Sequence, residues 1–139
     1  MSTIALLSCV SQKVEYKTEA RNMYISSLFT KSLKYAENIL KPDIIYILSA
    51  KHGLLKLDKV IDPYNETLNT KNREEQQIWA NKVLMQTRKE CNINVDTFIF
   101  LAGKKYYRNL IQHLPNNKII MENMPIGKRL QWLTKEIGA

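Results

Sequence analysis

The stretch Ile-Ile-Tyr-Ile-Leu-Ser-Ala-Lys-His-Gly, residues 44–53, decides the fold. Its leading apolar residues are typical of a strand that is covered on both faces, as strands of parallel sheets are. The residues that follow bring a hydroxyl, an amine, an imidazole and a flexible glycine into one loop. The sequence Asp-Pro-Tyr comes a few residues later, at 62–64. We interpret this loop as the floor of a binding or catalytic site.

Apolar runs and helical patterns alternate along the whole chain. The expected strands are Ile4–Leu7, Ile44–Leu48, Thr97–Leu101 and Lys118–Met121. Apolar residues at helical spacing predict helices over Leu28–Leu40, Arg73–Glu90, Tyr106–Leu114 and Ile126–Ile137. This alternation predicts a single-domain, three-layer α/β fold over residues 1–139, with a central four-stranded parallel sheet. The segment from Ala50 to Asn72 has no expected element, and long loops inside compact domains are usually functional or disordered.

Charge and composition narrow the class of partner. The net charge is +8, from 21 basic and 13 acidic residues, which favours polyanions such as nucleic acid. The alternative is a lysine-rich surface that only faces water. No apolar run is long enough to cross a bilayer, and two cysteines make no disulfide framework, so we expect a cytoplasmic protein.

Metal ions and nucleoside triphosphatase chemistry are not expected. The two histidines and two cysteines do not have the spacing of metal ligands. The loop after the first strand lacks the glycines of a P-loop. The sequence therefore predicts no metal and no cofactor.

A polar segment follows each of the four expected strands. These segments are Ser8–Lys13, Ser49–Gly53, Ala102–Tyr107 and Asn123–Lys128. Open parallel sheets bind ligands along the carboxyl ends of their strands, at the point where the strand order reverses. Free N–H groups at helix N-termini along that edge favour an anion.

Several motifs keep one order along nearly the whole chain. They are Ser8-Cys9 with Lys13, Met23–Phe29, Ser49–Leu55, Asp62-Pro63-Tyr64 with Thr67-Leu68, Trp79-Ala80, Leu101-Ala102-Gly103 with Tyr106, and Pro125–Leu130 with Trp132-Leu133. As a set they resemble the YaaA-like proteins and a related group of small bacterial and phage domains. The resemblance implies a uracil-DNA-glycosylase-like fold and a pocket for a nucleobase or nucleotide. It also implies two kinds of role, because some members of the wider group excise modified bases and YaaA proteins are linked to DNA binding under peroxide stress.

Two residues are the catalytic candidates. His52 would donate a proton to a leaving base or bind phosphate, and the alternative is a histidine bonded to local backbone. Asp62 would stabilise a cationic sugar or position water. The alternative for Asp62 is turn chemistry, since Asp before Pro commonly starts a turn.

The substrate-binding candidates come from the same segments. Tyr64 would stack on a base or plug the core. Ser8, Ser11 and Lys13 would hold phosphate. The other candidates are Tyr24, Ser26, Ser49, Lys51, Gly53, Gly103, Tyr106 and Lys128. Lys104, Lys105 and Arg108 form a basic cluster near the same edge, for which phosphate contact and plain solvation are both open.

These expectations lead to one hypothesis and two rivals. The hypothesis is an N-glycosidase of the DNA base-excision type, acting on a modified base in nucleic acid, DNA rather than RNA, or in a nucleotide. The first rival is a non-catalytic DNA-binding protein of the YaaA stress type. The second is a sensor or sponge for a free nucleotide. The sequence predicts no membrane partner and leaves the oligomeric state open.

Overall fold

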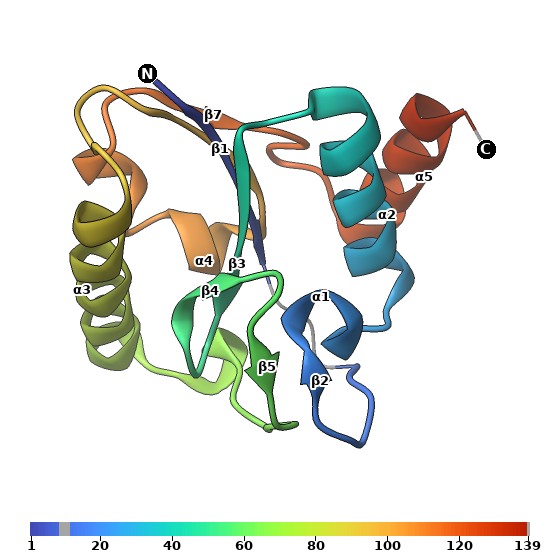
Figure 1. The fold of residues 1–139 in the computed structure, drawn as a ribbon, viewed down its shortest axis with the longest axis horizontal. Helices are drawn as coiled ribbons and strands as arrows, with labels where there is room; N and C mark the ends of the chain where they lie inside the picture. Colours follow the sequence, from blue (N-terminus) through green and yellow to red (C-terminus); the bar gives the residue numbers. More distant parts are fainter. Residues whose placement is uncertain (9–11, 139) are drawn as a thin grey trace.

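A five-stranded sheet forms the centre of the molecule in the computed structural model, which describes residues 1–8 and 12–138 (Figure 1). The strand order is β4-β3-β1-β6-β7. The bounds are β1 Thr3–Ser8, β3 Ile44–Ser49, β4 Gly53–Lys56, β6 Thr97–Leu101 and β7 Asn117–Ile119. Four strands run parallel, and β4 pairs antiparallel with β3 as a hairpin. A separate antiparallel pair joins β2, Thr18–Glu19, to β5, Val60–Ile61.

Helices cover both faces of the sheet. The helices α2, Ser27–Tyr35, and α5, Ile126–Ile137, lie together on one side, and α3, Arg73–Glu90, lies on the other (Figure 1). The shorter elements are α1 Ala20–Met23, the π-helical turn η1 Ala36–Leu40, the 3-10 turns η2 Leu68–Thr70 and η3 Ile111–His113, and α4 Lys104–Tyr107. The result is the expected three-layer α/β arrangement.

The central strand β1 explains why the sheet is buried. Residues 4–7 are all apolar and at most 1% exposed, because β3 and β6 flank them in the sheet and helices cover both faces. The layer on one face is held by contacts between α2 and α5. The Tyr35 ring packs on Trp132 at 5.1 Å between centroids, and Lys31 Nζ donates to Thr134 Oγ1 at 2.8 Å.

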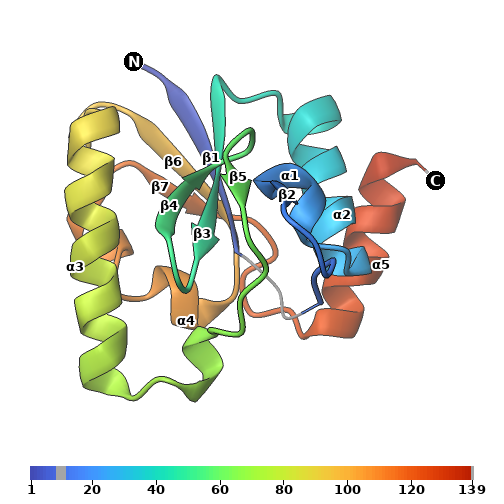
Figure 2. The same cartoon turned by 60° about the horizontal axis from the view of Figure 1, so that its bottom comes forward.

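The chain leaves the carboxyl ends of the neighbouring strands β1 and β6 in opposite directions. From β1 the chain crosses through α2 to β3 on one side, whereas from β6 it continues through α4 to β7 on the other side. The loops after β1 and β6 therefore diverge, and such a switch point is where parallel sheets form ligand crevices. Figure 2 turns the carboxyl ends of these strands toward the viewer.

The structure confirms the α/β class and corrects its details. The sheet has five strands rather than four, because residues 53–56 turn back on β3 instead of remaining in the loop. The expected helix over Tyr106–Leu114 is wrong: regular helix ends at Tyr107 and turns follow. The expected bounds of α3 and α5 are confirmed. Among the described residues, no helix combines the length and the apolar character needed to cross a bilayer.

Candidate functional site

A crevice of about 520 Å³ opens at the carboxyl ends of β1 and β6. We call it the crevice, and its lining comes from five separate parts of the chain. The lining residues are Ser8, Gln12, Ser26, Leu28, Asn69, Gly103, Lys104, Lys105, Tyr106, Ile126 and Arg129. It therefore occupies the switch point of the sheet, where the sequence predicts a ligand.

The crevice is positively charged. Lys104, Lys105 and Arg129 line it, and none of its lining residues is a carboxylate. Three cations around a cavity without an acid favour an anionic ligand. Hydroxyls of Ser8 and Ser26 add neutral hydrogen-bonding groups at the same place.

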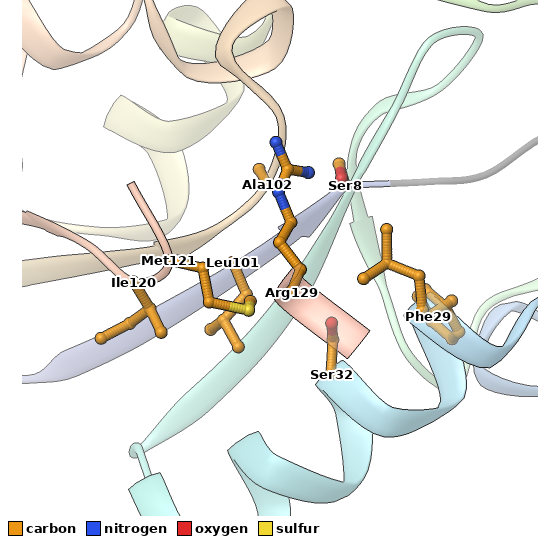
Figure 3. A pocket seen from close by; sticks show the side chains of 9 residues that line it. Ser8, Phe29, Ser32, Leu101, Ala102, Ile120, Met121 and Arg129 are labelled. Carbon is orange, nitrogen blue, oxygen red and sulfur yellow. The ribbon is translucent and has the colours of Figure 1, made fainter. Parts of the chain in front are cut away.

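Arg129 reaches the crevice from the first turns of α5. Its Nε donates to the Met124 carbonyl at 2.8 Å, which fixes the guanidinium and leaves its other N–H groups for a ligand. Figure 3 shows the side chain extending past Met121 toward Ser8 and Ala102, where β1 and β6 end. A hole of about 10 Å³ lies beneath it and shares Ser8, Leu28 and Arg129 with the crevice. Burial raises the pKa of the neighbouring Tyr107 hydroxyl; Glu122 adds to this rise and Arg129 opposes it.

A second group of polar side chains is buried behind the crevice. Tyr64 Oη lies 2.5 Å from Tyr24 Oη and 2.7 Å from Ser49 Oγ, and we call these three residues the hydroxyl cluster. Ser49 has no exposed surface and Tyr64 is 8% exposed. Ser49 Oγ also accepts from the backbone N–H of Lys51 at 3.3 Å and of His52 at 3.0 Å. The hydroxyl cluster thus fixes the turn between β3 and β4.

Two lysines contribute charge at the face of the Tyr64 ring. Lys13 Nζ lies 4.6 Å from the centre of that ring and 5.8 Å from that of Tyr24, and Lys51 Nζ lies 6.0 Å from the Tyr64 ring. These are cation–π distances. Lys13 is placed there because residues 12–14 pair with residues 23–25 through backbone hydrogen bonds of 2.9 and 3.1 Å.

His52 packs edge-on against Tyr64, with 5.4 Å between the ring centres. Its Nε2 is buried and makes no hydrogen bond to the described residues. The pKa of His52 is lowered, first by burial and then by the positive charges of Lys51 and Lys82, while Glu66 acts in the opposite direction. The neutral imidazole is therefore the form present at pH 7.

One aromatic contact connects the crevice to the hydroxyl cluster. Trp79 Nε1 donates to the Ser49 carbonyl at 2.8 Å, and its ring meets the Tyr106 ring edge-on at 5.6 Å. Tyr106 in turn lines the crevice. Trp79 is buried, as the sequence predicts, so the two regions share one packed wall.

The predicted site residues divide between these regions. The hydroxyl cluster and its surroundings contain Lys13, Tyr24, Ser49, Lys51, His52 and Tyr64. The crevice contains Ser8, Ser26, Gly103 and Tyr106. Ser26 has a second role, because its Oγ accepts from Phe29 N and caps α2. Ser11 lies outside the described residues.

Two predicted residues, Asp62 and Lys128, lie apart from both regions, and a third, Gly53, pairs with Ser49 in the hairpin beside the hydroxyl cluster. The Asp62 side chain is exposed after β5, and no hydrogen bond or ion pair among the described residues reaches its carboxylate. Lys128 is exposed and does not line the crevice. Gly53 is buried with φ of +74°, and the Gln86 amide fills the space that a side chain would need. Among the described residues, no hydrogen bond or ion pair therefore joins the Asp62 carboxylate to His52.

Arg129 is the principal residue that the sequence reasoning missed. Helical periodicity could have indicated that Arg129 faces inward, because residues 126, 129 and 133 share a face of α5 and Leu133 is fully buried. The adjacent Lys128 points away from that face. Gln12 and Asn69 were also missed, and no local pattern marks them, since their loops approach the crevice only through the tertiary fold.

The fold and the site define a single-domain α/β protein with a cationic crevice at the carboxyl edge of a mostly parallel sheet. The chain belongs to the family DUF6884, described as a family of unknown function, which matches residues 4–135. That range includes the described residues of both the crevice and the hydroxyl cluster. No curated protein matches the sequence. The resemblance to YaaA-like proteins stays a prediction.

Proposed function

We propose that the protein binds a nucleotide in the crevice and acts on its N-glycosidic bond. The observation that carries the proposal is the lining: three cations, no carboxylate and an aromatic ring at the switch point of the sheet. A volume of about 520 Å³ is within the range of small-ligand sites. Lysine and arginine side chains are common ligands of phosphate groups, which the charge of this lining suits.

The two halves of a nucleotide match different parts of the lining. Lys104, Lys105 and Arg129 supply charge for phosphate. Gln12 and Asn69 supply amides, which both donate and accept hydrogen bonds and so suit the edge of a base. Leu28 and Ile126 supply apolar surface for the flat faces of a base or sugar.

The reaction follows from the charge that develops in the transition state. When the bond between the sugar and the base nitrogen breaks, its electron pair goes to the base. Water then adds to the cationic sugar carbon, and the proton that this water loses passes to the base nitrogen. The amide N–H groups of Gln12 and Asn69 would donate to the departing base as negative charge develops on it. His52 would not protonate the base directly, since its Nε2 is enclosed beside Tyr64.

The proposed binding of a nucleotide is tested by comparing the affinity of the protein for nucleoside monophosphates with its affinity for the matching nucleosides. The monophosphate should bind at least about tenfold more tightly, because charge-assisted hydrogen bonds to phosphate contribute roughly 1.5–3 kcal/mol. Lys104→Gln and Arg129→Gln should each remove most of that advantage. Lys89→Gln and Arg88→Gln, exposed on the last turn of α3, are the matched controls. Equal affinity for nucleoside and monophosphate would refute phosphate binding.

Release of free base from nucleoside monophosphates, measured by chromatography, tests the proposed cleavage of the N-glycosidic bond. We expect the wild-type protein and Asp62→Asn to release base at similar rates, because Asp62 does not line the crevice. Arg129→Gln should slow release. A complete loss of release in Asp62→Asn with unchanged binding would restore Asp62 to the catalytic role that the sequence predicts.

A nucleotide sensor without hydrolysis is the second candidate. One observation favours it: glycosidases commonly use paired carboxylates, and none lines the crevice. It predicts tight binding of monophosphates with no base released from any of them. The same two measurements therefore separate the candidates.

A further inference from the structure

A second polar pocket lies beside the crevice. It encloses about 340 Å³ and is lined by Arg73, Gln76, Gln77, Arg108 and Asn109. Two guanidinium groups and three amides face this space, and no carboxylate is among its lining residues. This composition is that of a site for an anion with several oxygen acceptors.

Arg108 is held in place by a neutral partner. Its Nη2 donates to Gln76 Oε1, and Gln76 Nε2 donates to the Lys71 carbonyl at 2.8 Å. Gln76 is only 4% exposed, so its amide is anchored between the guanidinium and the backbone. An amide oxygen orients the guanidinium without cancelling its charge.

Both arginines keep their charge uncompensated. The ion pairs within residues 1–8 and 12–138 are Arg21–Glu37 and Lys71–Glu66. The acids nearest to Arg73 in sequence are Glu74, which is exposed, and Glu75, whose side chain accepts from the Asn72 N–H in the capping box of α3. The pocket is therefore pre-arranged and positive.

The pocket and the crevice are lined by neighbouring residues of the same two parts of the chain. Lys104, Lys105 and Tyr106 of α4 line the crevice, and Arg108 directly after α4 lines the pocket. Likewise Asn69 of η2 lines the crevice, and Arg73, four residues later at the start of α3, lines the pocket. The elements α4 and η2 contact each other, so they form a shared wall between the two spaces.

We propose that this pocket is a second phosphate subsite, which takes the phosphate of the nucleotide next to the one in the crevice. The ligand is then a single-stranded oligonucleotide or an unpaired segment of a longer nucleic acid. The inference rests on the proposed nucleotide site and extends it. A strand fits because basic grooves track successive phosphates of single strands, and because a base can enter a crevice only when it is unpaired or flipped.

Binding measured by fluorescence anisotropy tests the subsite. The probes are a labelled mononucleotide and labelled trinucleotides of deoxyribose and of ribose, so that the arms also distinguish DNA from RNA. We expect the trinucleotide to bind at least about tenfold more tightly than the mononucleotide. Arg73→Gln should weaken trinucleotide binding by about tenfold and reduce its salt dependence by roughly one phosphate contact, while leaving mononucleotide binding within about twofold.

Arg88→Gln is the matched control, since it removes the same charge from the other end of α3. Arg108→Gln is the second variant, and thermal unfolding checks that losing the bond to Gln76 has not disturbed the fold. The subsite is overturned if Arg73→Gln weakens both probes equally, if it weakens neither, or if Arg88→Gln matches it. Mononucleotide binding without any gain for the trinucleotide refutes the subsite alone, whereas no binding of either probe refutes the crevice as well.

Discussion

The crevice and the hydroxyl cluster both follow strands of the same sheet, yet one is open and the other is closed. After β3 the chain turns straight back into β4, and Ser49, Tyr64 and Tyr24 are sealed against one another. After β1 and β6 the chain leaves in opposite directions, and a cavity of about 520 Å³ remains. Polar residues therefore stabilise the fold at the end of β3 and line a ligand-sized space at the ends of β1 and β6. The direction in which the chain leaves each strand decides which of these two roles its polar residues take.

The energetic consequences of the two regions also differ. A buried polar group costs free energy unless it is hydrogen-bonded. Removing one member of the hydroxyl cluster should therefore destabilise the fold, because the other members lose a hydrogen-bond partner. The lysines of the crevice are exposed and hydrated, so each can be removed with little effect on the fold. Substitutions in the first region should change the free energy of unfolding, and substitutions in the second should change binding.

Gly53→Ala should have the largest effect on stability. Gly53 has φ of +74°, which an L-residue adopts only with strain, and a Cβ there would overlap the Gln86 amide. That amide is not free to move, because its Oε1 accepts from Leu54 N at 2.8 Å and its Nε2 donates to the His52 carbonyl at 3.0 Å. We expect a loss of roughly 2–5 kcal/mol, measured by urea unfolding.

The control for this substitution is Gly127→Ala. Gly127 lies in the first turn of α5 with a negative φ and no atom within 4 Å of its would-be Cβ, so alanine should be neutral or stabilising by up to about 1 kcal/mol. If Gly53→Ala were as stable as Gly127→Ala, the turn after β3 would not be the rigid support that we describe.

Ser49→Ala should have the next largest effect. It removes the acceptor for two backbone N–H groups and the partner of Tyr64 Oη, in a position with no exposed surface. Leaving such groups unsatisfied costs about 1–3 kcal/mol. Ser27→Ala, at an exposed position in α2, should change stability by less than about 0.5 kcal/mol and serves as the control. Equal unfolding curves for the two variants would argue against a structural role for the cluster.

The sequence predicted those elements whose signals are local. The bounds of α3 were predicted from apolar residues that repeat at helical spacing, and in the structure a capping box of Asn72 and Glu75 starts the helix. The strand β4 was not, since Gly53–Lys56 is short and its pairing with β3 depends on a tertiary hairpin. The prediction of a helix over Tyr106–Leu114 was wrong for a related reason. Apolar residues spaced four apart show which residues are buried, but they do not show that the backbone between them is helical.

The sequence predicted where the candidate site lies, but it predicted only some of the residues that line it. The convergence of polar segments at the carboxyl edge follows from the parallel topology, and the crevice lies there. The roles of individual residues do not follow: the sequence leaves Tyr64 either to stack on a base or to plug the core, and the structure buries it with its hydroxyl bonded to Ser49 and Tyr24. Asp62 shows the same limit: it lies only two residues before Tyr64, but its side chain faces water.

Protonation of His52 should lower stability in mildly acidic solution. The pKa of the folded-state imidazole is lowered by burial and by Lys51, Lys82 and, more weakly, Lys59, with Glu66 opposing. The unfolded chain therefore binds the proton more readily, and stability is complete above the usual histidine pKa of about 6.5. It falls as the pH drops from there through the lowered pKa of the folded protein.

Urea unfolding at several pH values measures this loss. His52→Asn should flatten the pH dependence between about pH 6.5 and the lowered value, relative to wild type. His113→Asn, which changes an exposed histidine at the end of η3, should leave the wild-type dependence in place. If the two variants gave the same profile, the enclosed imidazole beside Tyr64 would not be the group that titrates.

Gly103→Ala should have the smallest effect on the fold and a selective effect on binding. Gly103 has an ordinary φ of −71°, and the nearest atom to its would-be Cβ is Arg129 Nη1 at 3.9 Å, so a methyl group fits without strain. Unfolding should change by less than about 0.5 kcal/mol. The methyl would occupy the crevice next to the guanidinium, so nucleotide affinity should fall by up to about tenfold, which is about 1.4 kcal/mol. Gly127→Ala should leave affinity unchanged, and unchanged affinity in Gly103→Ala would place the nucleotide elsewhere, because the ligand would then not approach the end of β6.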